Sequence, residues 1–140
     1  MADRRMKNLD RVLAKLRKVP VSVQGAVGAK LKVEVDDLVA AQRRAAPVDE
    51  KAKNPGNFRD SIHGYPNPDR PLSFRILADA RDEDGKFIGS NIEQGHRAVD
   101  GTHVAGRPSF WPTYRARKKG MKRRLSASGS KALRQVFPKE

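Results

Sequence analysis

The feature that most constrains the fold is a long apolar stripe between two prolines. Between Pro20 and Pro47, apolar residues recur every three or four positions: Val23, Val27, Leu31, Val35, Leu38, Ala41 and Ala45. This spacing places them on one face of an α-helix, and proline ends a helix because it lacks an amide hydrogen. The sequence therefore predicts a long helix that buries one face against the rest of the chain.

Extended segments follow the predicted helix. Residues 72–80 alternate apolar and polar side chains, which is typical of a half-buried strand. We expect residues 86–96 to pair back with this strand as a hairpin, because the polar turn 81–85 separates the two. Residues 58–65 read as a shorter extended segment after a loop that contains proline and glycine. Three strand-like segments indicate a small antiparallel sheet.

Two further helices complete the expected fold. A short amphipathic helix before Pro20 is predicted by the spacing of Leu9, Val12, Leu13 and Leu16. A C-terminal helix, with Pro112 in its first turn, is predicted by Trp111, Tyr114, Met121 and Leu125. The sequence SASGS (126–130) breaks this pattern. We therefore expect one α+β domain over residues 1–125, with N-terminal helices packed on the sheet, and a flexible basic tail over residues 126–140.

The charge of the chain is concentrated near its C-terminus. The 140 residues hold 30 Lys and Arg against 16 Asp and Glu, a net charge of +14. Residues 101–140 hold 11 of these basic residues and only one acidic residue, Glu140. Such a cationic segment favours an acidic partner, either a nucleic acid or an acidic protein surface.

The sequence offers little for catalysis or metal binding. It has no cysteine, and its three histidines, His63, His96 and His103, lack the close spacing of zinc ligands. Ser61 and His63 lie near Asp60, but neighbouring residues of a strand point to alternate faces, which argues against a catalytic triad. We therefore expect no enzyme activity, no cofactor and no metal site. We also expect no membrane contact, because no apolar run is long enough to span a bilayer.

A basic run directly follows two aromatic residues, Trp111 and Tyr114. Seven of the ten residues 115–124 are basic: Arg115, Arg117, Lys118, Lys119, Lys122, Arg123 and Arg124. Lys and Arg release the counterions of nucleic-acid phosphates, and aromatic rings stack on bases. No RRM, KH or zinc-finger motif accompanies the run. Taken alone, the run is explained equally well by nucleic-acid binding and by a solvated basic helix face.

Three stretches of the chain together resemble a known protein family. They are AQRRAAPVD with GNFRDSI (41–49 and 56–62), IEQGH (92–96) and VAGRPSFWPTYRARKKGMKRRL (104–125). In order and spacing they are similar to the neck or tail-completion proteins of long-tailed bacteriophages, which are related to lambda tail protein Z and to the virion-morphogenesis protein of Mu-like phages. The residues that match the pattern of this family are Ala46, Pro47, Val48, Asp49, Gly56, Asn57, Phe58, Arg59, Ser61, Ile62, Glu93, Gly95, His96, Arg107, Pro108, Phe110 and Pro112.

The resemblance implies a structural virion protein of the head–tail joint, made in the host cytoplasm and placed at the neck or tail end of the particle. It would form a ring, usually sixfold, and would contact the tail-tube protein and head-closure or connector proteins. Non-specific contact with DNA in the channel is a further expectation.

The residues expected at the interface are Arg107, Phe110, Trp111, Tyr114 and the basic run, with Glu93 and His96 at the base of the preceding loop. A small basic nucleic-acid-binding protein is the alternative.

Overall fold

The structure, a computed structural model, describes residues 21–136, so the helix predicted around residues 9–16 lies outside the described residues. The chain has an α+β fold. Its elements are α2 (Val21–Ala45), α3 (Asn57–Asp60), β1 (Ile62–Pro66), β2 (Phe74–Ala78), α4 (Gly89–Gln94), β3 (Gly95–Arg97), β4 (His103–Ala105) and α5 (Phe110–Val136).

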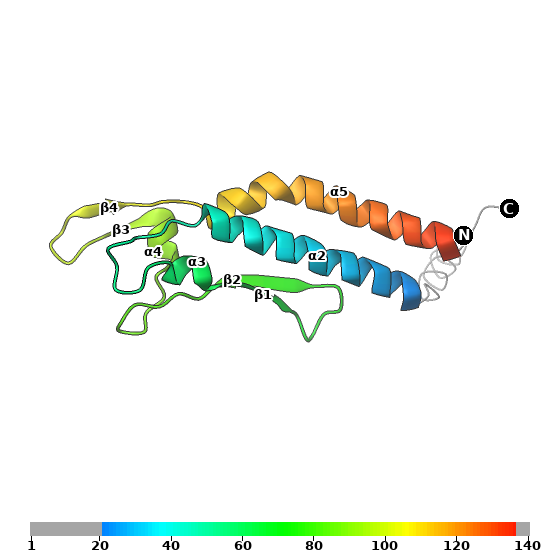
Figure 1. Ribbon diagram of the computed structural model, residues 1–140, viewed down its shortest axis with the longest axis horizontal. Coiled ribbons are helices and arrows are strands. Elements are labelled where there is room, and N and C mark those ends of the chain that lie inside the picture. Colours follow the sequence, from blue (N-terminus) through cyan, green and yellow to red (C-terminus); the bar gives the residue numbers. More distant parts are fainter. Residues whose placement is uncertain (1–20, 137–140) are drawn as a thin grey trace, which may run out of the picture.

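The two long helices, α2 and α5, form the body of the molecule. They lie side by side and run in opposite directions, and the β1–β2 ribbon covers the other side of α2 (Figure 1). With 25 and 27 residues, these helices are each about 40 Å long at 1.5 Å per residue. Helix α2 is therefore the central element, with a partner on two sides.

The apolar stripe predicted for α2 is buried over most of its length, but it does not describe the whole buried surface. Val35 and Leu38 are almost fully buried, whereas Ala45 at the end of the predicted stripe is exposed. Two polar residues, Glu34 and Gln42, are buried instead. Their side chains bond to α5, at Arg124 and at the Phe110 carbonyl respectively. Because α2 packs on two sides, its buried surface is wider than one apolar stripe.

The predicted hairpin between residues 72–80 and 86–96 is wrong. Strand β2 pairs antiparallel with β1, in a register that runs from Ile62↔Ala78 to Pro66↔Phe74. The two strands are joined by residues 67–73, and the amide of Asn67 donates a 2.9 Å hydrogen bond to the Ser73 carbonyl. Residues 67–73, which include Asn67 and two prolines, therefore form the hairpin loop, since proline and Asn favour turns.

Most of the predicted strand 86–96 is the short helix α4. Pairing across the polar turn is limited to one isolated bridge, Arg81↔Phe87. The last residues of this segment begin β3, which pairs with β4 in a second ribbon. The described residues thus hold two separate two-stranded sheets rather than one sheet of three strands.

Helix α5 continues through the residues that we expected to break it. Ser and Gly are weak helix formers, but tertiary packing overrides propensity where small residues allow close approach. A Cβ atom on Gly129 would lie 3.7 Å from Val27 on α2, and Ala132 one turn later is buried. Residues 126–136 therefore belong to the helix, and the predicted helix boundary at residue 125 is wrong.

The apolar core is small and lies near the end of α2. Its buried residues are Ala46, Phe58, Ile62 and Ala80, and Phe110 packs against them from the start of α5. In the part of the chain that the structure describes, nine hydrophobic residues are buried while ten large hydrophobic residues are exposed. The fold therefore leaves much of its apolar surface uncovered.

Candidate functional site

The end of the molecule where α2 stops and α5 starts holds most of the predicted site residues. The carboxylate of Glu93, on α4, binds the first backbone amides of α5 at this end. Glu93 Oε1 accepts hydrogen bonds of 2.7 Å from the backbone amides of Ser109 and Phe110, and one of 3.2 Å from the Ser109 hydroxyl. These amides belong to the start of α5, where the helix dipole also favours a negative charge. Glu93 thus acts as an N-cap supplied from outside the helix.

Two glycines, Gly95 and Gly106, allow the two backbone segments at the base of the β3–β4 hairpin to approach each other closely beside this cap. We call this close approach the glycine crossing. A Cβ atom on Gly106 would lie 2.6 Å from the Glu93 carbonyl oxygen and 2.7 Å from the Gly95 amide nitrogen. Gly95 has a φ of +81°, and its Cβ would lie 2.5 Å from the Val104 carbonyl oxygen. Only glycine fits both positions, because the atoms that a side chain would meet are backbone atoms. The β3–β4 hairpin therefore leaves and rejoins the molecule at one point.

Replacing Glu93 with alanine is expected to lower the free energy of unfolding by about 2 kcal/mol, because two amides of the α5 start lose their acceptor. Thermal melting of the purified chain measures this. Glu83→Ala is the matched control, since its exposed carboxylate pairs with exposed Lys53 and exposed pairs contribute little. Equal melting temperatures for the two variants would contradict the capping role.

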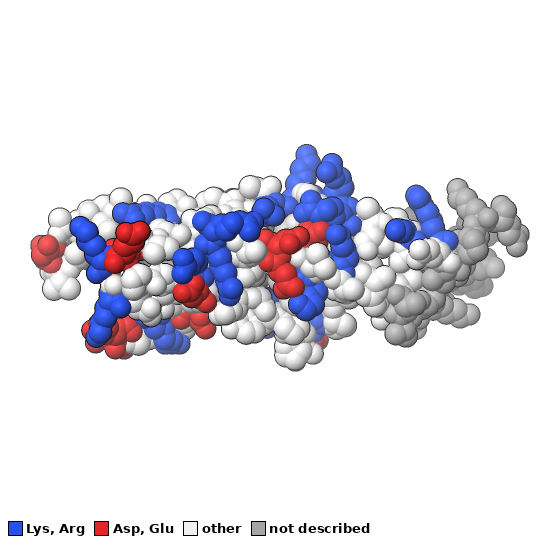
Figure 2. Space-filling view, viewed as in Figure 1, with Lys and Arg blue, Asp and Glu red and all other residues white. Residues whose placement is uncertain are grey.

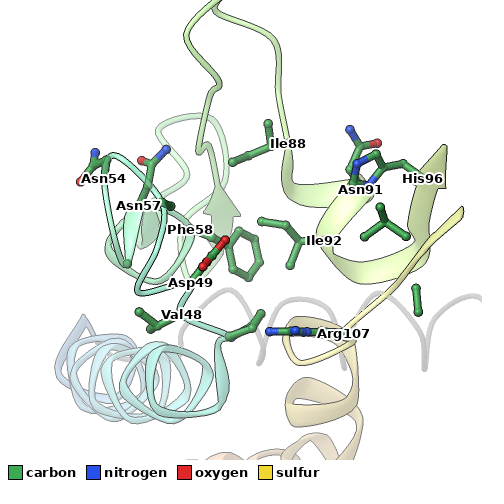
Figure 3. Close-up of a pocket in the computed structure, with 15 residues that line it drawn as sticks. Val48, Asp49, Asn54, Asn57, Phe58, Ile88, Asn91, Ile92, His96 and Arg107 are labelled. Atoms are coloured by element: carbon green, nitrogen blue, oxygen red, sulfur yellow. The ribbon is translucent and has the colours of Figure 1, made fainter. Parts of the chain in front are cut away.

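An open groove lies beside the crossing, with a volume of about 520 Å³. Four segments surround it: the loop after α2, the start of α3, helix α4, and the β3–β4 hairpin with the residues that follow (Figure 3). Phe58, Ile88 and Ile92 give it an apolar lining. Its polar groups are the side chains of Asp49, Asn54, Asn57, Asn91, His96 and Arg107.

The groove brings together residues from all three stretches on which the family resemblance rests. Pro47, Val48 and Asp49 come from the first, His96 from the second, and Arg107 from the third. Asn57 is fixed in place by a 3.0 Å hydrogen bond from its side-chain amide to the Arg81 carbonyl. A concave lining that combines apolar side chains with several polar groups is typical of a binding pocket. Within residues 21–136, no three His, Asp or Glu side chains cluster as metal ligands.

His96 lies on β3, next to the base of the hairpin. Its backbone pairs with Val104 in the β3–β4 ribbon, and its exposed imidazole lines the groove. Glu93 and the two glycines also hold this base.

Three aromatic rings follow one another at the start of α5. Phe110 and Trp111 contact edge to face with 5.4 Å between ring centroids, and Trp111 and Tyr114 do the same at 6.2 Å. Phe110 is partly buried against the core, whereas Trp111 is 52% exposed. The Lys118 ammonium lies 5.8 Å from the Tyr114 ring centroid. Trp111 therefore presents an apolar surface next to positive charge.

The basic run is divided between two faces of α5. Six of its residues are exposed: Arg115, Lys118, Lys119, Lys122, Arg123 and Arg124. Arg117 is partly buried. Arg124 differs from the other five exposed residues, because its guanidinium donates hydrogen bonds to both carboxylate oxygens of buried Glu34, at 2.7 and 2.8 Å. Arg124 is thus an ion-pair partner within the fold, and its place at an interface stays a prediction.

The groove residues of the loop after α2 were missed as a site by sequence reasoning. Asp49 and Asn57 were noted only as matches to a family pattern, and Asn91 was not noted. The sequence held one indication of this site: the three stretches that resemble the family pattern each contain polar residues and glycine, although they lie far apart in the sequence. The sequence alone does not predict that the loop after α2 and the residues after β4 lie close together, since this contact depends on the path of α4.

No helix among residues 21–136 has an apolar stretch sufficient to cross a membrane. A scan against protein-family models found no match, and searches of curated proteins and of solved structures also found none.

Proposed function

We propose that this chain is a structural virion protein of the head–tail joint, a neck, tail-completion or tail-terminator protein. It acts by assembly, without catalysis and without a cofactor. Copies of the chain form a ring, with six copies the usual number in the family that the sequence resembles. The ring completes the tail, contacts the tail-tube protein on one side, and contacts head-closure or connector proteins on the other.

The observation that carries the proposal is the meeting of the three family-like stretches around one open groove. Residues separated by about sixty positions, such as Asp49 and Arg107, line the same cavity. The glycine crossing and the Glu93 cap hold the surrounding segments in place. This meeting supports the proposal, because the residues that resemble the family pattern line one concave surface.

The exposed apolar surface supports assembly as the mode of action. Exposed large hydrophobic side chains outnumber buried hydrophobic ones in the described part of the chain. Several lie on the ribbons, such as Leu77 on β2 and Val104 on β4, where two-stranded sheets lack further strands. Short ribbons of this kind gain stability when another chain covers them.

The test is to examine particles that assemble without this chain. Negative-stain microscopy of such a preparation is expected to show full heads separate from tails, or tails of irregular length. Complementation with the intact gene is the control and should restore joined particles. Normal, infectious tailed particles in the absence of the chain would overturn the proposal.

Replacing Trp111 with alanine is expected to impair ring or joint formation by tenfold or more. The melting temperature is expected to change much less, because the ring is 52% exposed and its aromatic contacts are with two neighbouring rings of the same helix. Infectious titre and size-exclusion chromatography measure the two effects. Phe87→Ala is the matched control, since Phe87 is an exposed aromatic residue outside α5, 59% exposed. Normal assembly of the Trp111 variant would contradict this role.

A further inference from the structure

Five exposed basic residues in the first half of α5 form one continuous stripe. Arg115, Lys118, Lys119, Lys122 and Arg123 follow the spacing i, i+3, i+4, i+7, i+8, which places them on one side of a helix. Trp111, four residues before Arg115, lies on the same side. Figure 2 shows Lys and Arg side chains projecting from the upper edge of the molecule, where Figure 1 places the middle of α5. We call these five residues the basic stripe.

The basic stripe has no acidic partner among the described residues. Helix α5 contains no Asp or Glu, and the salt bridges between described residues include none of the five. Like charges four residues apart occur three times within it, at Arg115–Lys119, Lys118–Lys122 and Lys119–Arg123. Each such pair destabilises a helix by a few tenths of a kcal/mol. The isolated chain therefore maintains a repulsive charge arrangement.

Arg124 differs from the basic stripe because it has an ion-pair partner within the fold. Its guanidinium reaches Glu34 on α2 and satisfies that buried carboxylate, so its charge is used inside the fold. The stripe residues are exposed, and apart from the contact of Lys118 with the Tyr114 ring, no contact between described residues accounts for their charge. A surface of this kind attracts an anionic partner.

The composition of the stripe favours phosphates over an acidic protein. Three of the five residues are Lys, which is depleted in protein–protein interfaces, whereas Lys and Arg are the main partners of nucleic-acid phosphates. The stripe extends about 12 Å along the helix axis, at 1.5 Å per residue. We propose that the basic stripe is a sequence-independent binding site for the phosphate backbone of double-stranded DNA.

This site is distinct from the groove and does not rest on the proposed function. The groove lies at the residues that precede α5, whereas the stripe begins one turn inside the helix. Loss of DNA binding with intact particle assembly, or the reverse, would separate the two proposals.

The experiment measures binding of the full chain to a fluorescent DNA duplex of about 30 base pairs by anisotropy, over a series of salt concentrations. Five phosphate contacts predict a slope of about −4.5 for log K against log salt. The triple variant Lys118→Gln, Lys119→Gln, Lys122→Gln leaves two contacts and is expected to give a slope of about −2. Its affinity at 0.1 M salt is expected to fall at least tenfold.

The matched control is the triple variant Lys51→Gln, Lys53→Gln, Lys86→Gln, which removes the same charge from exposed positions outside α5. Its slope is expected to match that of the unchanged chain. Equal loss in both variants would mean that net charge alone binds DNA, and it would overturn the site. Polyglutamate is the competing probe: competition as strong as that of unlabelled duplex at equal charge would assign the stripe to an acidic protein surface instead. Circular dichroism checks that both variants stay folded.

Discussion

Replacing Gly106 with alanine is expected to lower the free energy of unfolding by about 3 kcal/mol, which is at the upper end for an added methyl group. The new Cβ would lie 2.6 Å from two backbone atoms of residues 93 and 94 and 2.7 Å from the Gly95 amide nitrogen. Backbone atoms in a crossing cannot turn aside as a flexible side chain does. The crossing must open, which also moves the two amides that Glu93 caps.

Urea unfolding followed by circular dichroism measures this effect. Gly25→Ala is the control, because Gly25 lies in α2 with no atom within 4 Å of the added Cβ. It is expected to raise the free energy of unfolding by about 0.5–1 kcal/mol, since alanine is the better helix former. If the Gly106 variant unfolds at the same urea concentration as the unchanged chain, the crossing is not as tight as described.

The second large effect is expected at the ion pair between the long helices. Replacing Arg124 with alanine should cost about 3 kcal/mol, because the carboxylate of Glu34, 2% exposed, loses its bidentate partner. Lys30, at 3.3 Å, remains and limits the loss. Replacing Glu34 with glutamine should cost less, since the Arg124 side chain is 45% exposed and water can solvate its guanidinium. Thermal and urea unfolding of both variants measure this asymmetry.

The pH dependence gives an independent check on the same pair. The hydrogen bond from Arg124 lowers the pKa of Glu34 below its ordinary value of 4.5, against the opposing effect of burial. A lowered folded-state pKa adds stability above the unfolded pKa, and this stability is lost as the pH falls through the folded value. The deficit of the Arg124→Ala variant should therefore be largest at neutral pH and should shrink below about pH 4. A deficit that is constant with pH would show that the ion pair is not its cause.

The elements predicted correctly are those with a long, unambiguous period. The apolar repeat of α2 and the cluster at the start of α5 each continue over several turns, so local spacing identifies them. The strand 72–80 was also correctly placed, but its partner was not. The strand could have paired with residues 62–66 or with residues 86–96, and its partner depends on which connecting loop forms the tight hairpin. The hydrogen bond that closes this hairpin, from Asn67 to Ser73, lies in a segment with two prolines, which does not identify it as a hairpin loop.

The site was less accessible to sequence reasoning. A run of seven basic residues does not show that Arg124 pairs with Glu34, because this depends on a buried carboxylate 90 residues earlier. Likewise, Asp49 and Arg107 come together only through the path of α4 and the glycine crossing. Side chains that act locally, such as the exposed stripe, were identified correctly as a charged surface. Contacts between distant segments were not.

The crossing of Gly95 and Gly106 also makes the hairpin between them a replaceable module. Both ends of this excursion meet at one point, and its tip at Val99 is fully exposed. Lengthening or exchanging residues 98–102 therefore alters no packing in the body of the molecule. A peptide tag inserted at this tip is therefore expected to project from the molecule beside the groove without disturbing the fold.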